Sequence, residues 1–386
     1  MNKTVFEFVP SGSVTTPAGF LAAGVTAGFK RSGAPDFAMI VSQQPANFAG
    51  AFTSCTFAAA PVRVSQKRVR ESKAIRAVIV NSGNANACTG AAGIANAEKS
   101  CEIAARTLGV KAGEVMVGST GRIGVQLNMA TIEKGIKLAA EALNNRGGEA
   151  AAQAIMTTDT VPKSVAVSFQ LGGKTVSIGA MTKGAGMIDP NLKVLHATML
   201  CFITTDVKAD NDFLADLLDD GVADSFNRIT IDGDMSTNDT VILMANGAAG
   251  VEVKPGTAEA AVFKAALEQV MRELARKMVA DGEGATKFVE IKIVNAPSHR
   301  DAKLAAEAVA NSLLCKTAWF GNDPNWGRVV AALGYSGAEF DPDKTDIFYD
   351  AMPVVRQGGD AGTPEEALAG IIGKKEFTVL VDMHGG

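Results

Sequence analysis

The stretch MTKGAGMIDPNLKVLHATMLCFITTD, residues 181–206, decides how the rest of the sequence is interpreted. It begins with Lys183 beside a small-residue loop, which lets backbone segments approach closely. A polar loop with a proline follows, and the apolar run 199–203 then has the length of a buried strand. Thr198 lies at the junction, where a strand fixes a reacting hydroxyl and a loop leaves it accessible. From these residues alone, an ordinary strand start is the simpler interpretation.

The composition is typical of a globular protein with an ample core. The 386 residues predict one large or two ordinary domains, with 47% apolar and 20% charged residues. The net charge is −4 and no basic stripe is present, so nucleic acid is not an expected partner. The N-terminus lacks the apolar region of a signal peptide, and no apolar stretch reaches membrane-spanning length. We therefore expect a cytoplasmic protein with no membrane partner.

The cysteines and histidines do not indicate a metal site. The five cysteines show no CxxC pairing and are expected to be free thiols, mostly buried, in a reducing compartment. His196, His299 and His384 do not fall at metal-ligand spacings on one helix. A Ser-His-Asp or Cys-His arrangement stays open in principle, but the sequence offers no supported histidine, which favours a different base for any nucleophile in this chain.

Strand and helix patterns alternate along the chain and predict a layered α/β architecture with mixed sheets. Strands are expected at 36–42, 74–81, 115–124, 199–203, 229–232, 240–245, 287–294, 316–320, 345–349 and 377–381. A hairpin is expected from 164–171 and 175–179 around Gly172 and Gly173. Helices are expected at 90–108, 128–145, 150–156, 212–227, 258–280, 301–313 and 364–372, whereas 17–30 and the turn-forming cluster 321–328 are expected to be loops.

Several polar loops between these elements are candidates for a site. Thr120 and Gly121 lie in a glycine-bracketed loop that either presents backbone N–H groups to an oxyanion or forms an ordinary turn. Thr157 opens a run of four polar residues that suits a helix cap or a ligand shelf. Lys183 and Glu283 both lie on glycine-flanked loops, where a purely structural ion pair would be weak.

Ten segments, in order along the chain, resemble one enzyme family. They are PAGFLAAGVTAGFK (17–30), VNSGNANACTG (80–90), GSTGRIG (118–124), IMTTDT (155–160), KGAGMI (183–188), ATML (197–200), TDVKAD (205–210), DGDMSTNDT (232–240), ADGEGATK (280–287) and KTAWFGNDPNWGRV (316–329). Together they resemble the ornithine acetyltransferases, also called glutamate N-acetyltransferases, of arginine biosynthesis. The resemblance implies a layered α-β-β-α sandwich.

The resemblance also implies a self-cleaving enzyme. Cleavage between Ala197 and Thr198 would give subunits 1–197 and 198–386, with Thr198 as the nucleophile. Its freed α-amino group would be the base, because an α-amino pKa of roughly 7.7–8.0 suits proton transfer at neutral pH. Thr120 and Gly121 would form the oxyanion hole.

The same resemblance assigns the substrates. Thr157, Lys183, Thr198 and Glu283 would bind them. Acetyl would pass from N-acetylornithine to the threonine as an ester and then to glutamate, in a ping-pong reaction without a cofactor. Acetyl-CoA is a possible further donor, and two α and two β fragments are the expected assembly.

Two differences from the family pattern lead to further expectations. Residues 192–196 lengthen the connection before Ala197, which either alters the strain that drives cleavage or simply forms a bulge into solvent. The family continues past a strand like 376–386 into a segment that contacts substrate, so a chain ending at Gly386 is expected to cleave itself but to bind substrates poorly. Two alternatives stay open: a self-processing aminopeptidase or amidohydrolase on the same fold, and a non-catalytic relative.

Overall fold

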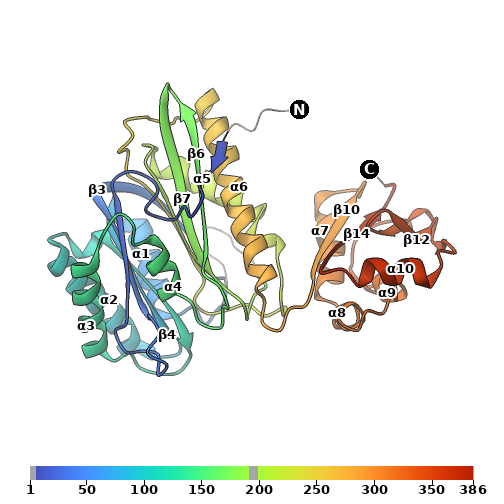
Figure 1. The fold of residues 1–386 in the computed structure, drawn as a ribbon, viewed down its shortest axis with the longest axis horizontal. Helices are drawn as coiled ribbons and strands as arrows, with labels where there is room; N and C mark the ends of the chain where they lie inside the picture. Colours follow the sequence, from blue (N-terminus) through green and yellow to red (C-terminus); the bar gives the residue numbers. More distant parts are fainter. Residues whose placement is uncertain (1–5, 191–198, 386) are drawn as a thin grey trace. The chain divides into compact units, whose positions relative to one another are not determined.

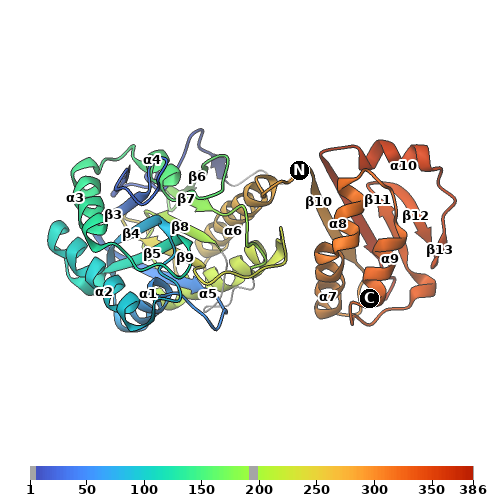
Figure 2. The ribbon, with the colours of Figure 1, turned by 90° about the horizontal axis from the view of Figure 1, so that it is seen from below.

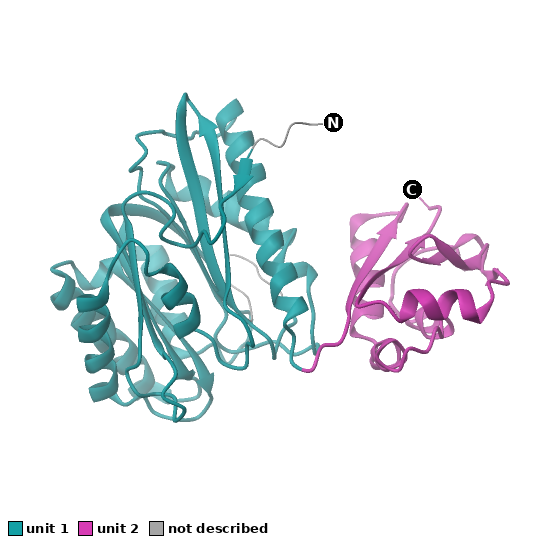
Figure 3. Cartoon of the chain, in the orientation of Figure 1, with its two compact units in different colours: residues 1–283 teal, residues 284–386 magenta. Residues whose placement is uncertain are grey.

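The computed structural model describes residues 6–190 and 199–385. The chain forms two compact units, unit 1 (Met1–Glu283) and unit 2 (Gly284–Gly386), shown in teal and magenta in Figure 3. The predicted cleavage site, Ala197 and Thr198, lies outside the described residues, as does the lengthened segment 192–196. The division into subunits 1–197 and 198–386 therefore stays a prediction.

One mixed sheet runs through unit 1. Its described strands are β1 (Phe6–Phe8), β2 (Phe20–Val25), β3 (Phe37–Phe52), β4 (Ile75–Asn84), β5 (Val115–Arg122), β6 (Lys163–Leu171), β7 (Lys174–Lys183), β8 (Leu200–Thr205) and β9 (Thr240–Ala245). They are ordered β1-β6-β7-β8-β9-β3-β4-β5, and β2 also pairs with β3. The first part of β3 pairs with β2 and β4, and its last part pairs with β9, so this long strand joins two sheet halves.

Helices of unit 1 cover the outer faces of the two sheet halves (Figures 1 and 2), whereas the helix at residues 148–154 packs into the core between them through Ala151, Ala152 and Ala154. They are α1 (Ala60–Glu71), α2 (Gly90–Leu108), α3 (Met129–Ala142), α4 (Gly148–Ala154), α5 (Asn211–Ala223) and α6 (Ala258–Ala280), with short 3₁₀ turns at Ala112–Glu114 and Phe226–Arg228. Figure 2 shows α2 and α3 beside β4 and β5, and α6 on the side of β7 and β8.

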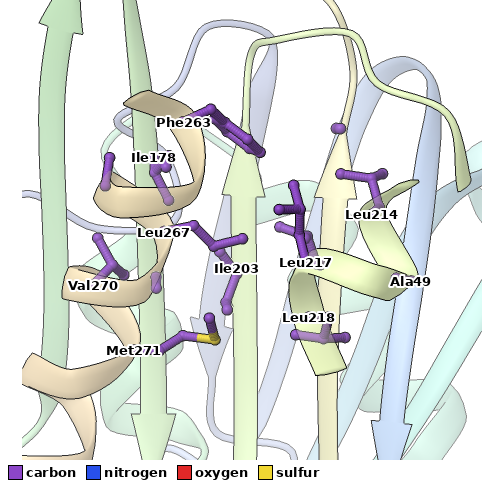
Figure 4. Packing of buried hydrophobic residues seen from close by; sticks show 14 of the residues in the cluster. Ala49, Ile178, Ile203, Leu214, Leu217, Leu218, Phe263, Leu267, Val270 and Met271 are labelled. Atoms are coloured by element: carbon purple, nitrogen blue, oxygen red, sulfur yellow. The ribbon is translucent and has the colours of Figure 1, made fainter. Parts of the chain in front are cut away.

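Alternating side chains of the strands divide the core into three clusters. In β8, Ile203 points to the outer cluster, where it packs with Leu217 of α5 and Leu267 of α6 (Figure 4). Its neighbour Phe202 belongs to the middle cluster, together with Val80 of β4. Because successive side chains of a strand point to opposite faces, each half of the sheet is covered on both sides.

The third cluster completes the layers. Ile79 of β4, adjacent to Val80, packs with Cys101 of α2 and Ile136 of α3. The order of layers is therefore helix, sheet, sheet, helix, and the predicted α-β-β-α sandwich is confirmed. Strands buried on both faces read as continuous apolar runs, which is why their positions were visible in the sequence.

Unit 2 is a smaller layer of helices on a sheet ordered β10-β14-β11-β12-β13. Its strands are β10 (Phe288–Val294), β11 (Asp346–Tyr349), β12 (Met352–Arg356), β13 (Gly359–Asp360) and β14 (Glu376–Asp382). Its helices are α7 (His299–Asn311), α8 (Leu313–Phe320), α9 (Gly327–Gly334) and α10 (Glu365–Ile372), with a 3₁₀ turn at Pro342–Lys344. Trp319, Tyr349 and Phe377 meet edge to face in its core.

Several sequence-based element predictions were wrong. Residues 316–320 form the end of α8 rather than a strand, because Ser312 caps this helix by accepting a hydrogen bond from the Cys315 N–H at 3.2 Å. Residues 229–232 are irregular, and Asp232 there accepts hydrogen bonds from the backbone N–H groups of Met187 and Ile188. The expected loop 17–30 contains β2.

Close packing explains why β2 was missed. A Cβ on Gly24 would lie 1.9 Å from the carbonyl oxygen of Ala150, so α4 can approach this strand only over glycine. The strand is therefore poor in the β-branched residues that mark other strands. The second half of β3 was missed because exposed residues 43–45, including a proline, interrupt its apolar pattern. Residues of the expected loop 321–328 likewise begin α9 at Gly327.

No helix in the described parts of the chain combines the length and apolarity needed to cross a membrane.

Candidate active site

A cavity of about 620 Å³ opens in unit 1 at one edge of the central sheet. Its lining residues come from segments far apart in the sequence, namely Lys30, Ser32, Gly83, Thr120, Gly121, Arg122, Ile123, Thr157, Thr158, Lys183, Gly186, Met187, Met199, Leu200, Ser236, Thr237, Asn238, Asp239 and Glu283. The described site residues predicted from the sequence, Thr120, Gly121, Thr157, Lys183 and Glu283, all lie on its wall.

Strand order explains why these segments meet. Lys183 ends β7, and it is paired with Leu200, which begins the antiparallel neighbour β8. Leu200 is in turn paired with Thr240 at the start of the parallel strand β9. The end of β7 and the beginnings of β8 and β9 therefore lie at the same edge, with Met199 and Asp239 just before the strands.

Lys183 is buried rather than placed on an exposed loop. Its prediction as a loop residue was wrong, because it is the last residue of β7 and only 8% of it is exposed. Its Nζ lies 3.5 Å from Oγ1 of Thr120, so the two side chains are joined by a long hydrogen bond. The ammonium group and the β5 terminus thus face the same part of the cavity.

Gly121 has a conformation that only glycine adopts there without strain. Its φ is +131°, and a Cβ would lie 2.4 Å from the carbonyl carbon of Gly83 and 2.6 Å from the nitrogen of Asn84. The backbone of β5 therefore packs directly on the last residues of β4, where Gly121 is paired with Gly83. This contact fixes the position of the peptide groups on either side of Gly121.

Glu283 lies on the turn after α6 and is exposed, as predicted. Its backbone N–H donates to the carbonyl oxygen of Ala185 at 2.7 Å. A Cβ on Gly186 would lie 2.4 Å from Oε1 of Glu283, so the carboxylate rests directly on that glycine. The loop after β7 and the turn after α6 are consequently held together at the cavity wall.

The basic groups of the cavity are partly desolvated. Burial lowers the pKa of Lys183, the carboxylate of Asp159 opposes this shift, and the ammonium group of Lys163 adds to it. Burial likewise lowers the pKa of Lys30, against the attraction of Asp36. A ligand with a carboxylate would relieve this cost by pairing with a buried ammonium group.

Sequence reasoning missed Asp239 and Asn238 as single residues. Asp239 is 2% exposed, and its Oδ2 has no hydrogen-bond partner among the described residues. Burial raises its pKa well above the usual range, although the ammonium group of Lys183 opposes this. Asn238 donates to the carbonyl oxygens of Ala85 at 2.6 Å and Ser119 at 2.8 Å. The only signal was the polar segment DGDMSTNDT, in which these two residues were not distinguished.

Within residues 6–190 and 199–385, no three His, Cys, Asp or Glu side chains gather in a way that would hold a metal ion. The described cysteines are all free, with Cys101, Cys201 and Cys315 buried and Cys88 exposed.

Comparison with known proteins gives consistent matches. A model of the ArgJ family matches residues 21–386. The arginine biosynthesis bifunctional protein ArgJ of Symbiobacterium thermophilum is 46% identical over 379 residues, covering 97% of this chain and 93% of the relative. The glutamate N-acetyltransferase of Methanocaldococcus jannaschii is 44% identical over 387 residues, covering 98% of this chain and 94% of the relative.

Solved structures include similar chains of about half this length. The ornithine acetyltransferase of Mycobacterium tuberculosis, in complex with ornithine, is 41% identical with a TM-score of 0.45 and covers 48% of this chain and 99% of its own. A bifunctional ArgJ protein from Bacillus halodurans is 39% identical with a TM-score of 0.46 and covers 48% of this chain and 97% of its own.

Proposed function

The chain belongs to the ArgJ family of acyltransferase enzymes, and on that premise we propose that it transfers acetyl from N-acetylornithine to glutamate in arginine biosynthesis. The observation that carries this proposal is the pairing of opposite charges on one cavity wall, from Lys183 and Glu283. An amino-acid substrate carries a carboxylate and, in ornithine derivatives, an ammonium group. Paired charges of this kind select for such a molecule and fix its orientation.

Lys183 would bind the substrate carboxylate and Glu283 the ammonium group. Thr157, whose backbone N–H donates to Asp159 at 3.0 Å, presents a further polar side chain to the cavity. A buried ammonium group gains more from such a contact than an exposed one, because little water competes for it.

The nucleophile in this proposal is Thr198. Met199, the next residue in the chain, lines the cavity, and its carbonyl oxygen accepts a hydrogen bond from the Thr240 N–H at 2.6 Å. Self-cleavage between Ala197 and Thr198 would free the α-amino group of Thr198, and this amine would take the hydroxyl proton. The products would be subunits 1–197 and 198–386, assembled as two copies of each.

The reaction proceeds in two half-reactions. The hydroxyl oxygen attacks the acetyl carbonyl of N-acetylornithine, the C–N bond breaks, and the α-amino group returns the proton to the departing amine. The amino group of glutamate then attacks the carbonyl carbon of the acetyl-Thr198 ester, and the bond from this carbon to the threonine oxygen breaks. The α-amino group of Thr198 takes the proton that the glutamate amine loses and passes it to the threonine oxygen, which restores the hydroxyl. Each oxyanion would be stabilised at Thr120 and Gly121, a contribution of about 3–4 kcal/mol at comparable sites. No cofactor is needed, because donor, hydroxyl and amine supply every reacting atom; acetyl-CoA is proposed as a second donor.

Intact mass of the denatured protein tests the proposal. We expect two fragments from the wild type, one acetyl added to 198–386 after incubation with N-acetylornithine alone, and a single inactive chain for Thr198→Ala. A wild type that stays in one piece yet transfers acetyl would refute the nucleophile. Release of free acetate without glutamate would instead identify a hydrolase.

A further inference from the structure

A buried group of three charged side chains lies behind the cavity wall without lining it. Lys163, the first residue of β6, is 1% exposed, and its Nζ donates to Oδ1 of Asp159 at 2.7 Å and to Oδ2 of Asp281 at 2.5 Å. The side chain of Asp159 is fully buried, and that of Asp281 is 8% exposed. One ammonium ion is therefore shared by two carboxylates, from segments more than 100 residues apart.

Asp159 connects this group to two residues of the cavity wall. Its Oδ1 accepts from the backbone N–H of Gly184 at 2.7 Å, and its Oδ2 accepts from the backbone N–H of Thr157 at 3.0 Å. Gly184 directly follows Lys183 and has a φ of +156°. The carboxylate thus fixes the backbone at both Lys183 and Thr157.

Asp281 connects the group to the third segment. It accepts hydrogen bonds from the N–H of Thr160, at 3.0 Å to Oδ2, and from the Thr160 hydroxyl. It lies two residues before Glu283, whose N–H donates to Ala185. The loops that carry Thr157, Lys183 and Glu283 are consequently held at fixed separations around one ammonium ion.

Stability alone does not account for this arrangement, because replacing a buried ion group with apolar residues is often neutral or stabilising. What charged hydrogen bonds add is directional geometry. We propose that Lys163 is a positioning residue, which sets the spacing of Thr157, Lys183 and Glu283 to that of an amino-acid substrate. This inference rests on the proposed acetyl transfer and deepens it.

The charge of Lys163 also acts on Lys183 through space. The ammonium group of Lys163 adds to the burial that lowers the pKa of Lys183. The other titratable groups that face Lys183 are Asp159, Asp239 and Glu283, each of which raises its pKa when ionised, and nearby Lys30. Lys183 must be protonated to bind a carboxylate, so activity falls as pH rises through its pKa. Removing the Lys163 charge raises that pKa and moves the fall to higher pH.

The test compares Lys163→Met with Lys163→Arg in the full chain. The methionine variant should lose about 10–100-fold in kcat/KM for N-acetylornithine, as expected when binding groups are displaced by about 1 Å. In the methionine variant, the fall of kcat/KM with rising pH should move to higher pH. The arginine variant keeps the positive charge, so this fall should stay where it is in the wild type. The matched control is Lys264→Met, which removes an exposed ammonium group 2.5 Å from Asp220 and should change neither quantity.

If the methionine variant does not fold, Asp281→Asn tests the positioning role of Lys163 instead, because the asparagine variant leaves Lys163 paired with Asp159. We expect a roughly 10-fold higher KM with a nearly unchanged kcat, from displacement of the Glu283 turn. A lower melting temperature in these variants with wild-type kcat/KM, KM and pH profile would overturn the inference. A wild type with no acetyl transfer would reject the proposed function itself.

Discussion

A carboxylate–cation cluster in unit 1 and another in unit 2 use the same chemistry with different access to water. Asp159 and Lys163 have side chains that are 0% and 1% exposed. In unit 2, Asp346 accepts from Arg356 at 2.7 Å and from His384 at 3.3 Å, but the Arg356 side chain is 52% exposed. Water can replace a lost partner only in the second cluster.

The difference follows from the two sheets. The sheet of unit 1 is covered on both faces, so polar groups at its edge are desolvated and must find partners in the protein. In β10 of unit 2, Glu290 and Lys292 are exposed, so this strand keeps a solvated face. Burial therefore makes the loss of a hydrogen-bond or ion-pair partner more costly in unit 1 than in unit 2. Three substitutions test this comparison.

Asp159→Ala should have the largest effect. It leaves Lys163 and two backbone N–H groups without this partner in a buried place, so we expect a loss of about 3–5 kcal/mol in the free energy of unfolding at pH 7. Burial alone would raise the pKa of Asp159, but Lys183 and Lys163 outweigh it and lower the pKa. Its stabilising contribution is therefore present above the unfolded-state pKa and lost as pH falls through the folded-state pKa.

Urea unfolding at several pH values measures this effect, with equal m-values as the condition for comparison. The loss of unfolding free energy caused by Asp159→Ala should become smaller at pH values below the folded-state pKa of Asp159. A cost under about 1 kcal/mol at pH 7 would show that this cluster behaves like a surface pair.

Asp239→Asn should have an effect of the opposite sign, and this effect is smaller for each single pH unit. Burial raises the pKa of Asp239, so the folded protein binds this proton more tightly than the unfolded chain. That contribution is complete below the unfolded-state pKa and is lost as pH rises toward the folded-state pKa. In this pH window, the free energy of unfolding of the variant should rise relative to that of the wild type by up to about 1.4 kcal/mol per pH unit.

Thermal unfolding of the wild type and of Asp239→Asn between pH 4 and pH 8 measures the difference in their free energies of unfolding. The free energies of unfolding of the two proteins should differ least at pH 4. A wild type that gains on the variant with rising pH would mean that Asp239 is ionised and well paired in the folded state.

Arg356→Ala should have the smallest effect, about 1 kcal/mol or less, because its ion pair is open to water. Part of this cost would come from the contact of the guanidinium group with the Phe348 ring, 4.5 Å from its centroid. Added salt should reduce the contribution of the ion pair to this loss of stability but should leave the contribution of the contact with Phe348 unchanged. Urea unfolding at low and high salt measures both, and a loss above about 2 kcal/mol would remove the contrast between the clusters.

The sequence alone determined the elements whose signal is local. The bounds of α2 and α6 were predicted correctly, and the glycine pair at 172–173 identified the hairpin of β6 and β7. Periodicity and turn residues carry this information within a few neighbouring positions. The family motifs likewise identified Thr120, Gly121, Thr157, Lys183 and Glu283, and the structure brings all five to one cavity.

Only the tertiary structure decided which polar residues are desolvated and what they pair with. Lys163 was not singled out in the sequence and lay just before the predicted strand 164–171, because its partner Asp281 is 118 positions away. Asp239 was one carboxylate in a polar run, and only the structure shows that it is buried just before β9. Burial depends on which segments pack above a residue, and contacts between distant segments form only when the layers assemble. For that reason the site residues were visible in the sequence, whereas the charges that position them were not.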